Sequence, residues 1–329
     1  MARLKLLLHP DDPTSFMNYW VREVMHSHQY VDLVEWQPNT KYDRNNHVLV
    51  INCMRYWPNQ QISRMQPDWF RLDWFRPYLN DGYKIVIDNL CDPHQLKNYQ
   101  HLFNEHCFVL ENQKWFWLHE SLTLRPRDRC KNYQPNRTYQ NLALLPLLKS
   151  RPHRDQLLIH LSEILDQIIW SYVEHGRRLP NDPDIVQDRH FNPEWYDNTY
   201  FSIVSETLVN VINPPDLHLP FVTEKTFKPI AYRHPFVVAA QPGHLQYIRN
   251  LGFETFDNLF DEGYDSIADW SLRLTSIINT IKQFKKQPYD KLTLHKIEHN
   301  YNRFFNKSLV DSQFINEILF PIINYAESK

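Results

Sequence analysis

The sequence predicts an α/β protein whose first half is a doubly wound domain with a parallel sheet. Two apolar runs, Val48–Cys53 and Lys84–Asp88, are rich in β-branched residues and continuous rather than alternating, as is typical of parallel strands that helices cover on both faces. Leu4–Leu8 is a third short apolar run. The segments between these runs carry apolar residues at helical spacing, for example from Phe16 to Met25. This alternation of strand and helix predicts the doubly wound fold.

The rest of the first half contains two more expected strands and a linker. Phe108–Leu110 and Trp115–Leu118 are expected as later strands of the same sheet. The stretch Pro126–Pro135 is polar, basic and interrupted by proline, which is typical of a linker. We therefore expect a first domain over residues 1–135.

The second half is expected to open with a helix. Apolar residues from Leu158 to Ile169 fall at helical spacing after Asp155, and Gly176 is a plausible stop. Residues 179–199 carry prolines and many Asp and Asn residues, so a loop is expected there.

The later elements are expected to alternate again between strands and helices. They are strand pieces at Ser202–Val204 and Leu208–Ile212, a short helix at Glu224–Arg233, a strand at His234–Ala240, and helices at His244–Asn250, Ile267–Phe284 and Leu292–Ala326. We expect a second domain over 136–300 and a C-terminal helix in 301–329 that packs back on the first domain.

Composition excludes several classes of protein. The 329 residues are long enough for two domains or one large one, and 42% hydrophobic residues are too many for a disordered chain. A net charge of -2 gives no global attraction to nucleic acid or to an anionic membrane. Only 5 glycines are present and no glycine-rich phosphate loop exists, so any phosphate has to be held by side chains and helix ends.

The cysteines and the apolar runs predict where the protein works. Cys53, Cys91, Cys107 and Cys130 show no C-x-x-C spacing, which disfavours a structural zinc site and favours a reduced, intracellular chain. The N-terminal apolar run is too short for a signal peptide, and no run reaches the roughly 18 residues that a membrane span needs. We therefore expect a cytoplasmic protein with no membrane partner.

The most informative motif is Thr223-Glu224-Lys225-Thr226-Phe227-Lys228 at the expected start of a helix. Helix N-termini attract anions, and lysines add point charge there. A carboxylate at this place can accept hydrogen bonds from ribose hydroxyls, and Lys225 can neutralise a departing diphosphate. The alternative is an ordinary helical turn with solvated charges.

A second basic cluster precedes the first helix of this half. Arg137 follows the linker, and His153 and Arg154 stand in Arg151-Pro152-His153-Arg154. An arginine and a histidine at a helix start form an anion site. The alternative is a basic surface linker.

Metal binding is not expected. Asp182-Pro183-Asp184 matches the Asp-x-Asp spacing of manganese sites, but two prolines and a polar loop favour coincidence. The histidines are scattered, and no H-E-x-x-H exists.

The region around the motif resembles the signature of the α1,3-fucosyltransferase family. The matching segments are Tyr200–Glu206, Phe221–Lys225 and Pro235–Val238. The chain is more similar to the wider set of viral and bacterial fucosyltransferase-like enzymes. Ser205 and Thr207 differ from the family's Phe and Asn, so the resemblance leaves the sugar open.

The resemblance implies a GT-B fold, in which two Rossmann-like domains face a central cleft. It also implies an inverting, metal-independent transfer of a sugar from a GDP- or UDP-linked donor to a hydroxyl acceptor such as a glycan. The second domain would bind the donor through Thr223, Glu224, Lys225 and Lys228, with an arginine, Arg137 or Arg154, on the diphosphate. By the same resemblance Glu206 would lie beside the donor sugar or shape the loop.

The resemblance places the catalytic base in the first domain, on a loop after a strand. An inverting transfer needs a group that removes the acceptor's proton. Lys84–Asp88 is such a strand and Asp92-Pro93 follows it, so Asp88 or Asp92 is the expected base. Asp88 could instead only cap the next helix.

Two rival functions remain open from the sequence. One is a glycosyltransferase that acts on modified bases of DNA, which would need a flipped-out base and a basic rim. The other is a non-catalytic module that binds a nucleotide sugar without turnover.

Overall fold

The computed structural model describes residues 4–8, 29–35, 37, 40–52, 78–89, 107–111, 117, 121, 139–180, 193–210 and 220–328. The chain divides into two compact units, Met1–Trp115 with Lys307–Lys329, and Phe116–Asn306. They are called unit 1 and unit 2 below, and each is described by itself. The domain limits expected from the sequence, 1–135, 136–300 and 301–329, stay a prediction.

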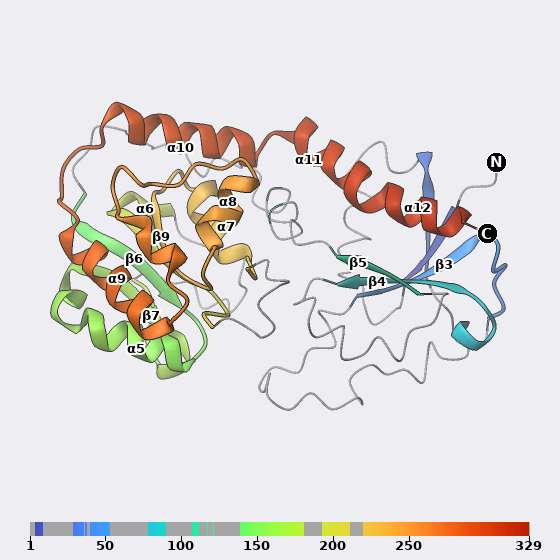
Figure 1. The fold of residues 1–329 in the computed structure, drawn as a ribbon, viewed down its shortest axis with the longest axis horizontal. Helices are drawn as coiled ribbons and strands as arrows, with labels where there is room; N and C mark the ends of the chain where they lie inside the picture. The colour runs from blue at the N-terminus through green and yellow to red at the C-terminus, as the bar shows by residue number, and fades with distance from the viewer. Residues whose placement is uncertain are drawn as a thin grey trace. The chain divides into compact units, whose positions relative to one another are not determined.

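Unit 1 contains a parallel sheet of five strands in the order β2-β1-β3-β4-β5 (Figure 1). The strands are β1 Leu4–Leu8, β2 Val31–Glu35, β3 His47–Asn52, β4 Lys84–Asn89 and β5 Cys107–Glu111. The continuous apolar runs are buried, with Leu6, Leu49 and Ile85 fully enclosed. The α/β class predicted from these runs is therefore confirmed. β2, an edge strand, was not predicted, because Asp32 and Glu35 interrupt its apolar residues and leave no continuous apolar run.

The C-terminal helices of unit 1 end against this sheet. They are α11 Lys307–Phe314, the π-helical turn Ile315–Leu319 and α12 Phe320–Glu327. The Lys84 ammonium donates hydrogen bonds to the carbonyls of Tyr325 (3.0 Å) and Ala326 (2.8 Å), and to that of Ser328. The last carbonyls of a helix lack hydrogen-bond partners within the helix and form the negative end of its dipole. A cation placed there supplies the missing donors and a favourable charge.

Unit 2 contains a parallel sheet of four strands in the order β7-β6-β8-β9. The strands are β6 Asn141–Leu147, β7 Ile168–Tyr172, β8 Thr199–Ser205 and β9 Phe236–Ala239. All residues of β8 and β9 are buried, as expected for strands with covered faces.

Several sequence-based assignments in unit 2 were wrong. The loop expected over 179–199 contains a helix at Pro193–Asp197, and Trp117, expected in a strand, is helical. The helix expected from Asp155 toward Gly176 ends at Leu161, and Ile168-Ile169-Trp170 forms the start of β7. β-branched and aromatic residues favour a strand there, although their spacing also fitted a helix. Leu208, expected in a strand, lies in a loop after β8.

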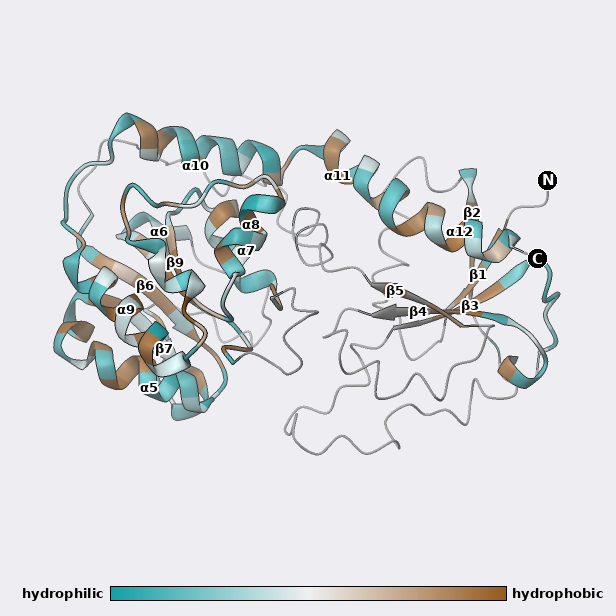
Figure 2. Ribbon diagram, in the orientation of Figure 1, coloured by the Kyte–Doolittle hydropathy of each residue, from teal (hydrophilic) through white to brown (hydrophobic). Residues whose placement is uncertain are grey.

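Helices cover both faces of the unit 2 sheet (Figure 1). They are α5 Pro152–Leu161, α6 Pro193–Asp197, α7 Glu224–Ala231, α8 His244–Asn250, α9 Trp270–Gln283 and α10 Lys291–Phe304. α9 packs on β9 and on α5, whereas α7 packs on β8 and on α10. Figure 2 shows β6 largely hydrophobic and α10 mostly hydrophilic, as a buried strand and an outer helix should be.

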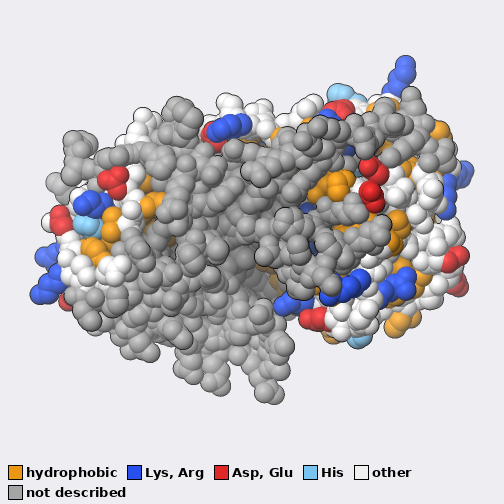
Figure 3. Space-filling model, turned by 180° about the vertical axis from the view of Figure 1, so that it is seen from behind, with side chains coloured by type: hydrophobic (Ala, Val, Ile, Leu, Met, Phe, Trp, Pro, Cys, Tyr) orange, Lys and Arg blue, Asp and Glu red, His pale blue; other side chains and the backbone are white. Residues whose placement is uncertain are grey.

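Two findings describe the surface. Among the described residues, no helix is both long and apolar enough to cross a bilayer. Seen from behind, the described Lys, Arg, Asp and Glu side chains are interspersed (Figure 3).

Gly252, just after α8, is expected to be sensitive to substitution. Its φ is +84°, and an added Cβ would lie 2.5 Å from the Cζ of Arg303. Arg303 is held there because its Nε donates to the Leu251 carbonyl at 2.7 Å. We expect Gly252→Ala to lower the free energy of unfolding by about 1–3 kcal/mol from backbone strain alone, and further through the clash with Arg303.

Gly176 provides the matched control for this prediction in chemical unfolding. Its φ is +76°, but nothing lies within 4 Å of an added Cβ. Gly176→Ala therefore carries the strain without the clash. If Gly252→Ala were no more destabilising than Gly176→Ala, the contact with Arg303 would not matter.

Candidate functional site

The candidate site lies at the carboxyl edge of the unit 2 sheet, where β6 and β8 are neighbours. After β6 the chain passes through α5 to β7 on one side, and after β8 it passes through α7 to β9 on the other. Such a change of direction is a topological switch point, and ligands of open α/β sheets bind outside the carboxyl ends of the strands there. The first turns of α5 and α7 flank this point.

The first turn of α7 presents a carboxylate and an ammonium group. Thr223 is the N-cap, and its hydroxyl accepts from the Lys225 N–H. Glu224 and Lys225 form an ion pair of 2.7 Å, and their side chains are 22% and 30% exposed. The sequence-predicted pair therefore lies at a sheet edge suited to ligands and reaches the surface.

Glu224 stays ionised because of its neighbours. Burial raises the pKa of Glu224, but the ammonium groups of Lys225 and Lys228 outweigh burial and bring the pKa to about 2. Lys228 is itself buried one turn further along α7. At neutral pH the Glu224 carboxylate is thus an acceptor for hydroxyl groups.

Glu206, directly after β8, is fully buried. Its Oε1 accepts from the Thr223 N–H (3.1 Å) and the Thr226 hydroxyl (2.7 Å). Its Oε2 accepts from the Thr223 hydroxyl (2.6 Å) and the Thr207 N–H (3.3 Å). Glu206 thus accepts from the N–H of the N-cap residue of α7, as the glutamate of a capping box does. Here, however, the glutamate follows strand β8 and does not belong to the helix. Its contacts favour positioning α7 over touching a ligand.

His153 and Arg154 tie the loop after β6 to the end of β8. His153 Nε2 donates to the Glu206 carbonyl at 3.0 Å, and burial together with Arg154 lowers the pKa of His153 to about 4, so the ring is neutral at neutral pH. Arg154 is buried and donates to the carbonyls of Lys149 (2.8 Å) and Ser205 (3.2 Å). Both residues lie at the predicted place, and their hydrogen bonds here go to backbone carbonyls.

Arg151 belongs to the basic cluster that the sequence identified, but Arg137 or Arg154 was expected to bind the diphosphate in its place. It is the half-buried N-cap of α5, a helix without a side-chain cap, and its Nε has no hydrogen-bond partner among the described residues. Burial lowers the pKa of Arg151, and Glu174 raises it. Proline at the first helical position was the available signal, because it puts the preceding residue outside the helix.

Electrostatic coupling joins the two sides of the switch point. Burial and Arg151 lower the pKa of Arg154, whereas Glu206 and Glu224 raise it. The charged groups at the starts of α5 and α7 therefore act on one another. An anion beside Arg151 and Lys225 would offset their positive charge.

Arg273, in α9, connects three loops at the same edge. Its side chain is 1% exposed. It donates to the carbonyl of Ala240 after β9 (3.0 Å), to that of Val209 after β8, and to those of Ile267 and Ala268 (2.9 Å) before α9. Sequence reasoning missed it, because a lone arginine in an amphipathic helix gives no local signal.

The remaining candidates fall either in unit 1 or outside the described residues. Asp88 is in β4 of unit 1, where its backbone is in register with Asn52 and Leu110. Asp92, Arg137 and Asp182–Asp184 lie outside the described residues. Within the part of the chain that the structure describes, no three His, Cys, Asp or Glu side chains are grouped to hold a metal ion.

Comparison with known proteins adds no family to this description. No protein-family model matches the sequence, and no curated protein is similar to it.

Proposed function

We propose that this protein is a glycosyltransferase that binds a nucleotide diphosphate sugar at the carboxyl edge of the unit 2 sheet. The observation that carries the proposal is the partly exposed Glu224–Lys225 ion pair at the start of α7, beside the β6/β8 switch point. A carboxylate for ribose hydroxyls and an ammonium for phosphate, next to each other at a helix start, match the two polar parts of such a donor.

The proposed chemistry is inverting and metal-independent. The acceptor hydroxyl attacks the anomeric carbon, the bond from that carbon to the diphosphate breaks, and a carboxylate of unit 1, Asp88 or Asp92, takes the acceptor's proton. Lys225 and Arg151 offset the charge that develops on the leaving diphosphate. Most of the rate enhancement would come from this charge compensation and from positioning.

A GT-B architecture is part of the proposal. Both units carry a parallel sheet whose first four strands follow the same order, with the second strand outermost beside the first. Two such sheets in one chain support a pair of Rossmann-like domains, with the acceptor on unit 1 and the donor on unit 2.

The test is calorimetric binding and turnover with a panel of GDP- and UDP-sugars. We expect Lys225→Ala to bind the nucleotide about tenfold to a hundredfold more weakly, because a charged hydrogen bond to phosphate is lost. Lys282→Ala is the control, since Lys282 in α9 pairs with Glu163, which follows α5 in the same unit, and this variant should bind the nucleotide as the wild type does.

Two results would count against the proposal. One is wild-type protein that binds no nucleoside diphosphate or nucleotide sugar. The other is an unchanged affinity in Lys225→Ala. Binding without turnover of any donor would instead favour the non-catalytic module.

A further inference from the structure

The buried carboxylate of Glu206 orients two threonine hydroxyls. A carboxylate only accepts hydrogen bonds, so the hydroxyl protons of Thr223 (2.6 Å) and Thr226 (2.7 Å) point toward it. Each hydroxyl oxygen then turns its lone pairs away from Glu206. Both oxygens are thereby ready to accept a hydrogen bond from a further group.

Those further groups are Lys225 and His244. The Lys225 ammonium donates to the Thr223 hydroxyl (3.0 Å), to Glu224 (2.7 Å) and to the Thr207 hydroxyl (3.4 Å). His244 Nε2 lies 3.0 Å from the Thr226 hydroxyl. Because the Thr226 hydroxyl directs its hydrogen toward Glu206, it can only accept from His244, so Nε2 has to carry the hydrogen, which assigns the tautomer of His244.

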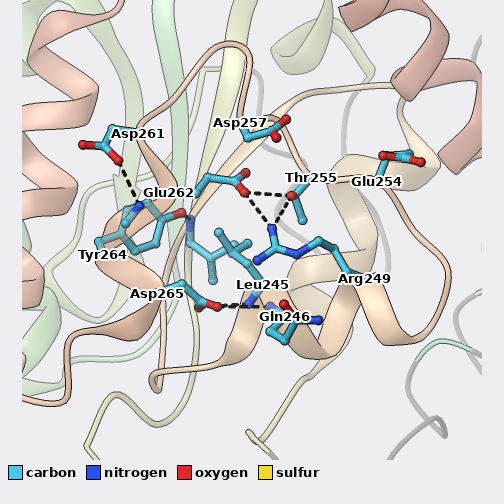
Figure 4. A network of polar contacts seen from close by, with 12 residues as sticks. Leu245, Gln246, Arg249, Glu254, Thr255, Asp257, Asp261, Glu262, Tyr264 and Asp265 are labelled. Carbon is cyan, nitrogen blue, oxygen red and sulfur yellow. Dashed lines mark hydrogen bonds and ion pairs between the residues drawn. The ribbon is translucent and has the colours of Figure 1, made fainter.

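The backbone beside His244 is fixed at the start of α8. The Asp265 carboxylate accepts from the N–H groups of Leu245 (2.9 Å) and Gln246 (3.0 Å), and Arg249 binds Glu262 at 2.8 Å (Figure 4). Asp265 accepts from the first N–H groups of α8, so these groups stabilise the fold and are not available to a ligand. The side chain of His244 is 1% exposed and therefore acts only on its neighbours.

We infer that Thr226 and His244 are positioning residues, which fix the Glu206 carboxylate and, through Thr223, aim the Lys225 ammonium at the ligand. Two donor series converge on the Glu206 carboxylate, one from His244 through Thr226 and one from Lys225 through Thr223, so the set forms one chain of hydrogen bonds that joins His244 to Lys225. It joins the ends of β8 and β9 to the first turn of α7. The inference rests on the proposed function for the identity of the ligand, but the orientation of Lys225 can be measured without a ligand.

The experiment compares Thr226→Val, which keeps the shape of the side chain, with Thr226→Ser, which keeps the hydroxyl. GDP and UDP serve as the probes, and their dissociation constants are measured by calorimetry. NMR of lysine-labelled protein reports whether the Lys225 ammonium protons are held, with Lys225→Arg used to assign the signal. Thr280→Val is the control, because its buried hydroxyl binds the Asp261 carbonyl outside the chain of bonds.

We expect Thr226→Val to lose the Lys225 signal and to bind the probe about tenfold more weakly. Thr226→Ser and Thr280→Val should keep both. A second pair gives the same test should Thr226→Val fail to fold: His244→Gln places an amide N–H near the position of Nε2, whereas the shorter side chain of His244→Asn does not reach it. Only the asparagine variant should behave like Thr226→Val.

Two outcomes overturn the inference. One is a Lys225 signal that stays the same in Thr226→Val and in His244→Asn. The other is wild-type protein without a held Lys225 ammonium. A wild type that shows the held ammonium but binds neither probe would overturn the proposed function while leaving the inference standing.

Discussion

Replacing Arg273 with methionine is expected to lower the free energy of unfolding by about 4 kcal/mol. The guanidinium group is buried and donates to carbonyls in three loops, among them Ala240 (3.0 Å) and Ala268 (2.9 Å). Burial lowers the pKa of Arg273, while Asp265 and Asp269 raise it. Methionine would fill the space of the stem but leave these carbonyls without donors in a dry environment.

The measurement is urea unfolding of the variants beside the wild type. Arg273→Lys should lose an intermediate amount, because an ammonium group cannot reach carbonyls in several directions as a planar guanidinium does. Arg177→Met is the control, since Arg177 is exposed, donates to the Trp170 carbonyl and lies over the Trp170 ring. If Arg273→Met lowered the free energy of unfolding no more than Arg177→Met does, the hydrogen bonds from Arg273 to the three loops would not stabilise the fold.

The second large effect is expected from Glu224→Gln and should depend on pH. The pKa of Glu224 is about 2 in the folded protein, below its ordinary value of 4.5. A depressed carboxyl pKa stabilises the fold above the unfolded value, and this stabilisation is lost as the pH falls through the folded value. The free energy of unfolding of the wild type should therefore be higher than that of the variant by about 2 kcal/mol near neutral pH. This value is reduced because Glu224 is partly exposed to solvent.

The check is the difference in unfolding free energy between the two proteins across the acid range. The difference should be constant above the ordinary pKa of 4.5 and should disappear on approach to a pH of about 2. Glu163→Gln is the control, because Glu163 is an exposed partner of Lys282, and its effect should be much smaller. A difference that does not change with pH would contradict the assigned ionisation.

The strands that were predicted correctly are those whose apolar residues form a continuous buried run. β3, β4 and β9 are continuous apolar runs whose described side chains are largely buried, and this leaves a local pattern in the sequence. β7 was missed because Ile168-Ile169 also fits a helix. β6 was missed as well, and it contains Pro146, a residue that usually argues against a central strand.

The neighbours of Pro146 explain how β6 tolerates it. On the adjacent strand, the Ser171 hydroxyl accepts from the Leu147 N–H (3.1 Å) and donates to the Leu147 carbonyl (3.2 Å). The Ser171 side chain thus supplies hydrogen bonds to the backbone of Leu147, the residue after the proline. No property of residues 141–147 by themselves could reveal this partner, because it comes from a strand formed later in the chain.

The candidate site shows the same division between local and distant information. The sequence identified Thr223 to Lys228 and the Arg151–Arg154 cluster, since a helix start with acids and bases is a local pattern. It did not reveal that His153 and Arg154 turn toward backbone carbonyls while Arg151 lies outside the helix. Which side of a helix faces the sheet depends on packing with other elements.

The sequence by itself therefore determined the α/β class, most of the strands and the helix start that carries Glu224 and Lys225. Only the tertiary structure decided that Glu206, Thr226 and His244 form one buried chain of hydrogen bonds behind that pair. The physical reason is that apolar spacing and helix capping act over a few residues, whereas the direction of a buried hydrogen bond depends on donors that folding brings from other strands.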